Sequence, residues 1–118
     1  MPERTDVLEQ ADENSPWYLY LIRDRDNRLY TGVTTNVTRR FQQHCAGKGA
    51  RNLRGRMPLV LYCAFVIGTK PEAMRAEYRL KRWSKAHKEQ LPSSPHLQQR
   101  LWESAGIMTS TCSPKIYI

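Results

Sequence analysis

The sequence predicts a small α+β domain, in which a three-stranded antiparallel sheet is flanked by helices in the order β-β-α-β-α, with one further short helix. Three observations support this prediction. Two segments rich in aromatic and branched residues stand on either side of a polar turn, an apolar run of nine residues follows, and a helix-capping motif comes directly after the run. The 118 residues are enough for one such domain.

The predicted elements follow one another closely, because extended aromatic-rich segments alternate with segments of helical apolar period. In chain order they are strands at Trp17–Arg23 and Leu29–Thr34, a helix at 37–46, a strand at Leu59–Ile67, a helix from Thr69 to Trp83 or Lys85, a helical continuation to Leu91 and a short helix at 96–104.

The first two strands form a hairpin, because residues 24–27 between them are polar and typical of a turn. A turn centred there pairs Ile22 with Tyr30 and Tyr20 with Gly32. The two tyrosines then share one face as diagonal neighbours. Gly32 supplies no side chain, so we expect a notch beside the Tyr20 phenol that a ligand could approach. On the hairpin alone, a packed tyrosine pair explains this pattern better than a binding site does.

The first helix is predicted from its cap and its apolar stripe. Thr35 or Asn36 is a suitable N-cap, and Val37, Phe41 and Cys45 recur at four-residue spacing. We therefore expect this helix to pack one side against the sheet.

The central strand and the second helix are joined at a glycine. The apolar run at 59–67 is too short for a membrane span and is typical of a strand buried on both faces. Gly68 ends it. Thr69 and Glu72 then form a capping box, with Pro71 in the first turn.

Glu77 is the unusual residue of the second helix, because a helical wheel places it between two apolar arcs. Burial of a carboxylate costs free energy unless the group is paired or holds a metal. A salt bridge to a nearby Arg or Lys is the alternative to a metal site. The core arc is Ala73, Ala76, Leu80 and Trp83, and the second arc is Met74 and Tyr78.

Three regions are predicted: a flexible acidic leader at 1–15, the folded domain at 16–91 and a loosely held tail at 92–118 that contains the short helix. Pro92 and Pro95 separate the domain from the tail.

Charge is distributed unevenly along the chain, whose net charge is +8. The leader has one arginine against five acids, whereas residues 16–90 have 16 basic and five acidic residues. No acid occurs between Asp26 and Glu72. Such a field favours binding to a polyanion, and nucleic acid is the expected partner rather than a solvated basic surface alone.

Other protein classes are excluded. The polar leader is unlike a signal peptide, and no apolar run is long enough to cross a membrane, so no membrane partner is expected. Cys45, Cys63 and Cys112 are odd in number and match no zinc spacing. We expect a reduced, cytoplasmic protein.

An ordered set of motifs resembles the GIY-YIG nuclease domain. Tyr18-Leu19-Tyr20 is followed ten residues later by Tyr30-Thr31-Gly32, and then by Arg40 and Glu77. The stretch from Trp17 to about Leu91 is most similar to small stand-alone bacterial members of that family.

The resemblance implies metal-dependent hydrolysis of phosphodiester bonds, in DNA more than in RNA. It implies that Tyr20, Tyr30, Arg40 and Glu77 are catalytic, with Glu77 as the metal ligand, Gly32 as the glycine of the second motif, and His44 where some members carry a histidine. From the residues alone, Arg40 and His44 share a helix face, and packing at the edge of the core is an alternative role for both.

The acids favour a mechanism with one metal ion. A two-metal site needs several carboxylates, but Asp24 and Asp26 lie in the turn and Glu72 in the cap. Glu77 alone is well placed. Mg²⁺ accepts one carboxylate together with waters and substrate oxygens, and Mn²⁺ is similar enough to replace it.

Tyr20 or Tyr30 is expected to activate the attacking water, with Tyr20 preferred. A tyrosine needs a pKa about 3 units below its usual value of ~10 to act as a base near neutral pH. Arg40, His44 or the metal would lower the pKa in this way. The residues expected to bind flanking phosphates are Arg39, Lys48, Arg51, Arg54 and Arg56.

Two other functions stay open. The altered neighbours of the motif tyrosines, and the absence of an asparagine after Glu77, motivate a nucleic-acid-binding module that cleaves weakly or not at all. The apolar tail and Trp102 motivate a protein-interaction role. Specificity would come from the shape of the DNA, a flap or branch, a homodimer or a protein partner.

Overall fold

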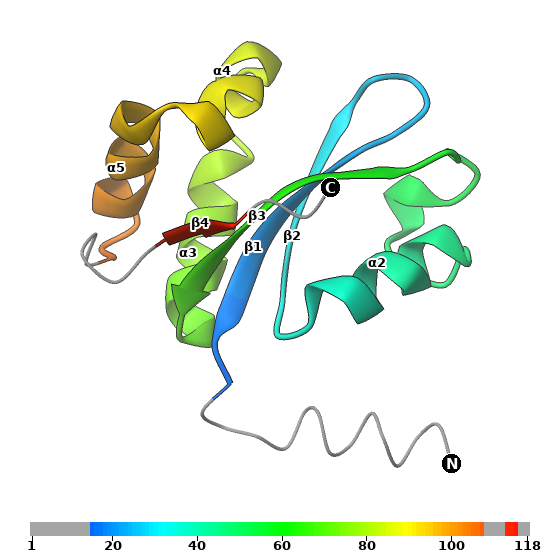
Figure 1. Cartoon of the computed structure of the whole chain (residues 1–118), viewed down its shortest axis with the longest axis horizontal. Helices are drawn as coiled ribbons and strands as arrows, with labels where there is room; N and C mark the ends of the chain where they lie inside the picture. The colour runs from blue at the N-terminus through cyan, green and yellow to red at the C-terminus, as the bar shows by residue number, and fades with distance from the viewer. Residues whose placement is uncertain (1–14, 108–112, 116–118) are drawn as a thin grey trace.

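The computed structural model describes residues 15–107 and 113–115, which form one sheet between two layers of helices (Figure 1). The four strands are antiparallel and lie in the order β2-β1-β3-β4. Within the described ranges, no helix is long and apolar enough to cross a membrane. The elements are β1 (Trp17–Arg23), β2 (Leu29–Thr34), α2 (Val37–Cys45), β3 (Val60–Gly68), α3 (Lys70–Leu80), α4 (Lys85–Gln90), α5 (Pro95–Ser104) and β4 (Ser113–Lys115).

The predicted hairpin and its register are confirmed. Tyr20 pairs with Gly32 and Ile22 pairs with Tyr30 across β1 and β2. The turn is held by Asp24, whose carboxylate accepts hydrogen bonds from the backbone N–H groups two and four residues further on. Asn27 adopts a positive φ of 66° in this turn, which asparagine tolerates better than most residues.

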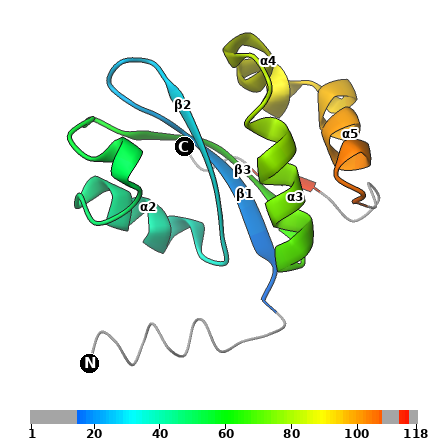
Figure 2. The same cartoon turned by 180° about the vertical axis from the view of Figure 1, so that it is seen from behind.

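The sheet separates two hydrophobic cores, because side chains alternate along β1. Tyr20 and Ile22 face α2, where they pack with Val37. Leu19 and Leu21 face the opposite layer, which contains α3 and α5. Figures 1 and 2 show α2 on one side of the sheet and the other helices on the second side. The sheet therefore carries functional candidates on the α2 face and most of the core on the other.

The central strand is buried on both faces over only part of its length. β3 covers residues 60–68, and full burial on successive residues is confined to 63–65. Val60 is 52% exposed, because it pairs with Arg23 at the end of β1. The strand predicted from Leu59 begins one residue later, and the prediction of burial on both faces was wrong at Val60 and Leu61.

The second long helix begins as predicted and ends earlier. Thr69 and Glu72 form the capping box. The helix ends at Leu80 rather than at residues 83–85, because a tight turn follows and Ser84 caps the separate helix α4. Met74 and Tyr78 are 47% and 59% exposed, so the predicted second apolar arc is solvent-exposed instead.

The part of the C-terminal segment at residues 95–107 packs against the larger core. The short helix is confirmed as α5, and its Leu101 and Trp102 are buried in the larger core. The Trp102 ring packs edge-on against Phe65 at 5.5 Å, so this residue gives no support to a protein-interaction role. The strand β4 then pairs with β3 and adds a fourth strand to the predicted three. Except for Ser15, the predicted leader lies outside the described residues.

Candidate active site

The Tyr20 phenol and the His44 imidazole form a buried hydrogen-bonded pair. Both side chains are 2% exposed, and the Tyr20 Oη lies 2.9 Å from His44 Nε2. The backbone N–H of Ala50 donates to His44 Nδ1 at 3.1 Å. A neutral imidazole has one donor and one acceptor nitrogen, so Nε2 carries the proton and donates it to the phenol oxygen. The hydroxyl proton of Tyr20 therefore plays no part in this bond.

His44 is neutral rather than cationic at neutral pH. Burial lowers its pKa from the usual 6.5 to about 4, and the positive charge of Arg40 acts in the same direction. The expectation that a His44 cation would depress the pKa of a tyrosine was wrong. His44 instead acts on Tyr20 as a hydrogen-bond donor.

The environment of the Tyr20 phenol contains the other catalytic candidates. Burial raises its pKa above the usual value, and the nearby Tyr30 and Glu77 act in the same direction. A hydrogen bond and the positive charge from Arg40 lower this pKa, but they do not outweigh burial. The protein by itself therefore disfavours the phenolate, contrary to the depression expected from the sequence.

The three aromatic side chains form one cluster. The ring centroids of Tyr20 and Tyr30 lie 6.3 Å apart, and His44 lies 5.9 Å from Tyr20 and 5.5 Å from Tyr30. The predicted sharing of one face is confirmed. These contacts fix the phenol of Tyr20 between the edge strand and α2.

Two glycines make room for this cluster. A Cβ on Gly32 would lie 2.4 Å from the Tyr20 Oη, so the ring itself fills the space that we expected to be an empty notch. A Cβ on Gly49 would lie 2.1 Å from His44 Nδ1. From the sequence, Gly49 was expected only to let the basic loop adapt, and its close approach to His44 was not predicted.

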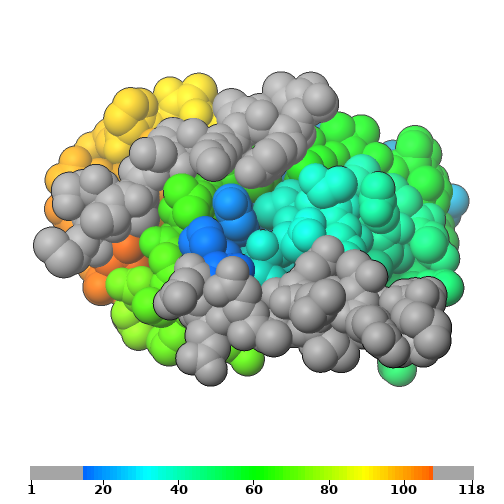
Figure 3. Space-filling view, turned by 60° about the horizontal axis from the view of Figure 1, so that its bottom comes forward, coloured from blue at the N-terminus to red at the C-terminus, as the bar shows by residue number. Residues whose placement is uncertain are grey.

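Glu77 reaches this region from α3, which packs on the opposite face of the sheet from α2 and also contacts the edge strand β2. In Figure 3, the start of β1 in blue reaches the surface between α2 in cyan and α3 in yellow-green. The Glu77 carboxylate is 19% exposed and lies 3.4 Å from the ammonium group of Lys81. The salt bridge considered from the sequence is thus present.

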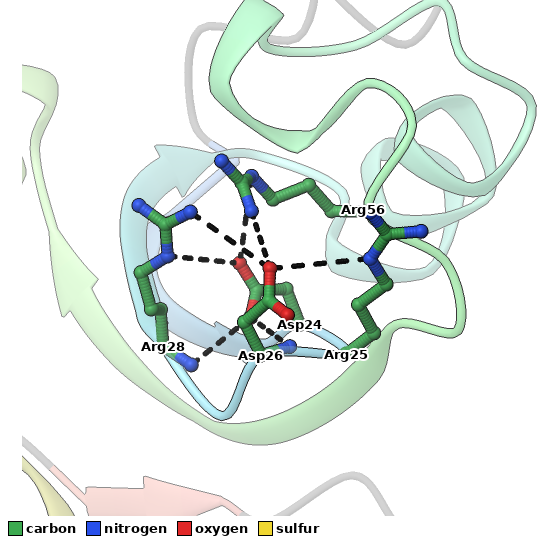
Figure 4. Close-up of polar contacts among 5 residues, drawn as sticks. All are labelled: Asp24, Arg25, Asp26, Arg28 and Arg56. Atoms are coloured by element: carbon green, nitrogen blue, oxygen red, sulfur yellow. Dashed lines mark hydrogen bonds and ion pairs between the residues drawn. The ribbon is translucent and has the colours of Figure 1, made fainter.

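The other acids of the described domain have structural partners. Asp24 and Asp26 are surrounded by the guanidinium groups of Arg25, Arg28 and Arg56 (Figure 4). In the same way, Glu72 completes the helix cap, and Glu89 pairs with Arg23 and Lys85.

Glu77 is the one candidate metal ligand among the acids of the described domain. Among the described residues, no group of three or more His, Cys, Asp or Glu side chains could hold a metal. Glu77 is the partly exposed carboxylate whose charge acts on Tyr20. Mg²⁺ commonly binds through one or two carboxylates and keeps several waters, so a single carboxylate is sufficient.

Basic side chains line an open cavity of about 370 Å³ beside Tyr30. Arg51 and Arg54 border it from the loop after α2. Arg56 also borders it, but its guanidinium binds the carboxylates of Asp24 and Asp26. The sequence had suggested that Arg56 binds a phosphate. We instead assign it to the structure of the turn.

The remaining predicted residues flank this region along α2. Arg39 lies in the first turn of the helix, and its backbone N–H donates to the capping side chain of Asn36. Arg40 donates to Gln43 at 3.0 Å. Lys48 is exposed in the loop directly after the helix. The charge of Arg40 also acts on the pKa of the Tyr20 phenol, whereas Lys48 lies at the periphery.

Comparisons with known proteins match most of the chain. A family model described as the GIY-YIG catalytic domain matches residues 16–90. The UPF0213 protein YhbQ of Escherichia coli O8 (strain IAI1) is 48% identical over 105 residues, covering 86% of this chain and 96% of the relative. The same-named protein of strain K12 / DH10B is 54% identical over 77 residues, covering 65% and 77% of the two chains.

A solved structure is also similar. The solution NMR structure of the UPF0213 protein BH0048 from Bacillus halodurans is 42% identical, covers 70% of this chain and 92% of that chain, and superposes with a TM-score of 0.43.

Proposed function

This chain belongs to the GIY-YIG family, and on this premise we propose that it is a metal-dependent endonuclease that hydrolyses phosphodiester bonds in DNA. One observation carries the proposal. The phenol oxygen of Tyr20 accepts a hydrogen bond from His44, and the positive charge of Arg40 and the negative charge of Glu77 are both close enough to act on its pKa. This combination serves both proton transfer and binding of a phosphate.

Tyr20 is the proposed general base. Its phenolate would accept hydrogen bonds from both His44 and Arg40, which stabilise the charged form in a buried position. Tyr30 borders the basic cavity, and in this proposal it would orient the attacking water. The preference for Tyr20 over Tyr30 rests on these two donors.

Arg40 and Glu77 have the electrostatic roles. The guanidinium of Arg40 would donate to the scissile phosphate, for which its planar fork is well suited. When bound at Glu77, Mg²⁺ or Mn²⁺ supplies positive charge for the leaving oxygen. The ion pair between Glu77 and Lys81 must open for this binding.

Four basic residues are proposed to bind phosphates on either side of the cleaved bond. Arg51 and Arg54 line the cavity beside Tyr30, and Arg39 and Lys48 lie along and after α2. Each neutralised phosphate releases counterions, which favours binding to DNA without reading its sequence.

A second candidate is a nucleic-acid-binding module that cleaves weakly. Two observations favour it: Lys81 already neutralises Glu77, and burial raises the pKa of Tyr20. A metal ligand that is paired and a base that resists ionisation would both slow hydrolysis.

The test is cleavage of labelled single-stranded, duplex and branched DNA, and of matching RNA, with Mg²⁺, Mn²⁺ or EDTA. We expect cleavage of DNA that needs the metal and that falls by at least about 100-fold in Glu77→Gln. Glu103→Gln is the matched control, because this exposed carboxylate contacts Gln99 and is remote from Tyr20 in the fold.

The outcomes separate the two candidates. Full activity in Glu77→Gln would refute the site. Binding of DNA without cleavage by the unaltered protein would favour the weakly cleaving module.

A further inference from the structure

A second cavity lies away from the tyrosine cluster, where the end of α3 meets α4 and α5. It encloses about 250 Å³. An adjoining cavity of about 390 Å³ shares Trp83 and Arg100 with it. The first cavity is lined by Arg82, Trp83, Ser84, His87, Leu97 and Arg100.

Two aromatic rings that meet nearly at a right angle form one corner of this cavity, which we call the slot. Trp83 packs in part against the larger core, which holds its indole in place. The His87 ring stands nearly perpendicular to it, with the centroids 6.3 Å apart. Ser84 holds His87 by bonds to its backbone N–H and its Nδ1, both at 3.2 Å. A planar, weakly polar ligand therefore has a rigid surface on which to stack.

The rim of the slot is positively charged. Arg82 and Arg100 are both exposed, and no carboxylate lines the first cavity. Arg100 makes no ion pair within residues 15–107. The acid in the adjoining cavity, Glu103, already accepts a hydrogen bond from Gln99. A ring slot beside two guanidinium groups matches a nucleobase with its phosphate.

The cavity lies just beyond the end of α3, the helix that carries the proposed metal ligand. Trp83 follows Glu77 by six residues and lies in the turn between α3 and α4. Between them, the exposed Tyr78 accepts a hydrogen bond from Arg82 at 3.1 Å and lies under its guanidinium at 5.5 Å. Between Glu77 and the slot, the chain thus carries an aromatic residue, Tyr78, and a basic residue, Arg82, that contact each other.

We propose that this cavity binds an unpaired nucleotide of the substrate strand, with the base against Trp83 and His87 and the phosphate at Arg82 and Arg100. The proposal rests on the proposed nuclease function and specifies its substrate as DNA with a single-stranded segment. Bases in a duplex are stacked on both faces, so only an unpaired base can offer a free face to these rings.

The test measures binding in EDTA, so that no cleavage is needed. Tryptophan fluorescence and anisotropy are followed on addition of single-stranded oligo(dT), a blunt duplex and thymidine 5′-monophosphate. We expect oligo(dT) to quench the fluorescence and Trp83→Phe to abolish most of this quenching, whereas the duplex binds without it. Equal quenching by the mononucleotide at the same concentration would overturn the assignment to a substrate strand.

Arg100→Ala provides a second measurement, because this residue is exposed and its replacement leaves the core intact. We expect about fivefold weaker binding of oligo(dT) and less than about twofold weaker binding of the duplex. Arg25→Ala removes the same charge at the hairpin turn and should affect both ligands equally. Equal effects of the two variants would overturn the proposal.

Failure of this inference can be told from failure of the nuclease proposal. If oligo(dT) quenches the fluorescence of Trp83 but the protein does not cleave DNA, the proposal of the slot stands and the nuclease proposal is refuted. If the Arg100→Ala variant cleaves a flap substrate normally and oligo(dT) does not quench the fluorescence of Trp83, the nuclease proposal stands and the proposal of the slot is refuted.

Discussion

The residue with the greatest influence on the site chemistry is His44, because its protonation state decides what it does to Tyr20. Nδ1 of His44 accepts a hydrogen bond from the Ala50 N–H, and Nε2 donates one to the phenol oxygen of Tyr20. A second proton would sit on Nδ1 and face the Ala50 N–H at 3.1 Å, which breaks that hydrogen bond. The buried hydrogen bonds of His44 therefore favour its neutral form over the imidazolium.

This preference predicts a pH-dependent stability. The pKa of His44 falls from 6.5 to about 4 on folding, so the unfolded chain binds more protons between these values. The contribution of the neutral His44 to the free energy of unfolding is complete above about pH 6.5. It falls by about 3 kcal/mol as the pH falls to about 4. Urea unfolding from pH 4 to 7.5 measures it.

His44→Gln should flatten the stability profile in this range, whereas the exposed His96→Gln should leave it unchanged. An equal pH dependence in His44→Gln and the unaltered protein would show that another group is responsible.

Gly49 yields a second prediction for single residues. A Cβ there would lie 2.1 Å from His44 Nδ1, so Gly49→Ala should destabilise the fold by about 1–3 kcal/mol. In a His44→Ala background the obstacle is absent, and the same change should cost less than about 0.5 kcal/mol. A double-mutant cycle in denaturant tests this coupling, and additive effects would contradict it.

At the scale of elements, the hairpin turn and the loop before β3 act as one unit. Asp24 and Asp26 gather arginines from both segments (Figure 4). The backbone N–H of Arg25 also donates to the Arg56 carbonyl at 3.1 Å. This connection positions the loop that carries Arg51 and Arg54 beside Tyr30.

Asp24 is predicted to be the key residue of this connection. Its carboxylate is buried and accepts two backbone hydrogen bonds, at 2.8 and 3.0 Å. Asp24→Ala should lower the free energy of unfolding by about 2–3 kcal/mol. Asp26→Ala removes a half-exposed carboxylate and should cost less than about 1 kcal/mol. Chemical denaturation compares the two, and equal losses would contradict the assignment.

The elements show which local patterns can be trusted. The hairpin, its register and the capped start of α3 are confirmed because turn residues and caps act within a few positions. The end of α3 and the exposure of Met74 and Tyr78 were predicted wrongly, because helical period alone does not tell how many neighbours cover a helix. The packing of α5 in the larger core was likewise not predicted, because it depends on contacts with distant segments.

At the scale of the whole molecule, the positive charge predicts salt-dependent binding of DNA. If Lys48, Arg51 and Arg54 each contact a phosphate, replacing any one with Gln should reduce the slope of log K against log salt concentration by up to about 0.9 for duplex DNA. Anisotropy between 50 and 200 mM KCl, about the range in which this effect is large, measures it.

Arg25→Gln is the control for this measurement, since its exposed side chain pairs with Asp26 in the turn. Unchanged slopes in all three loop variants would place the phosphate contacts elsewhere on the protein.

By itself, the sequence determined the hairpin with its tyrosine pair, the helix starts, the basic field and the family, because these follow from local residue order and composition. Only the tertiary structure decided that His44 is a neutral donor to Tyr20, that Gly49 admits it and that Arg56 serves the turn. The physical reason is burial: hydrogen-bond partners and desolvation depend on segments distant in the chain, which no local pattern specifies.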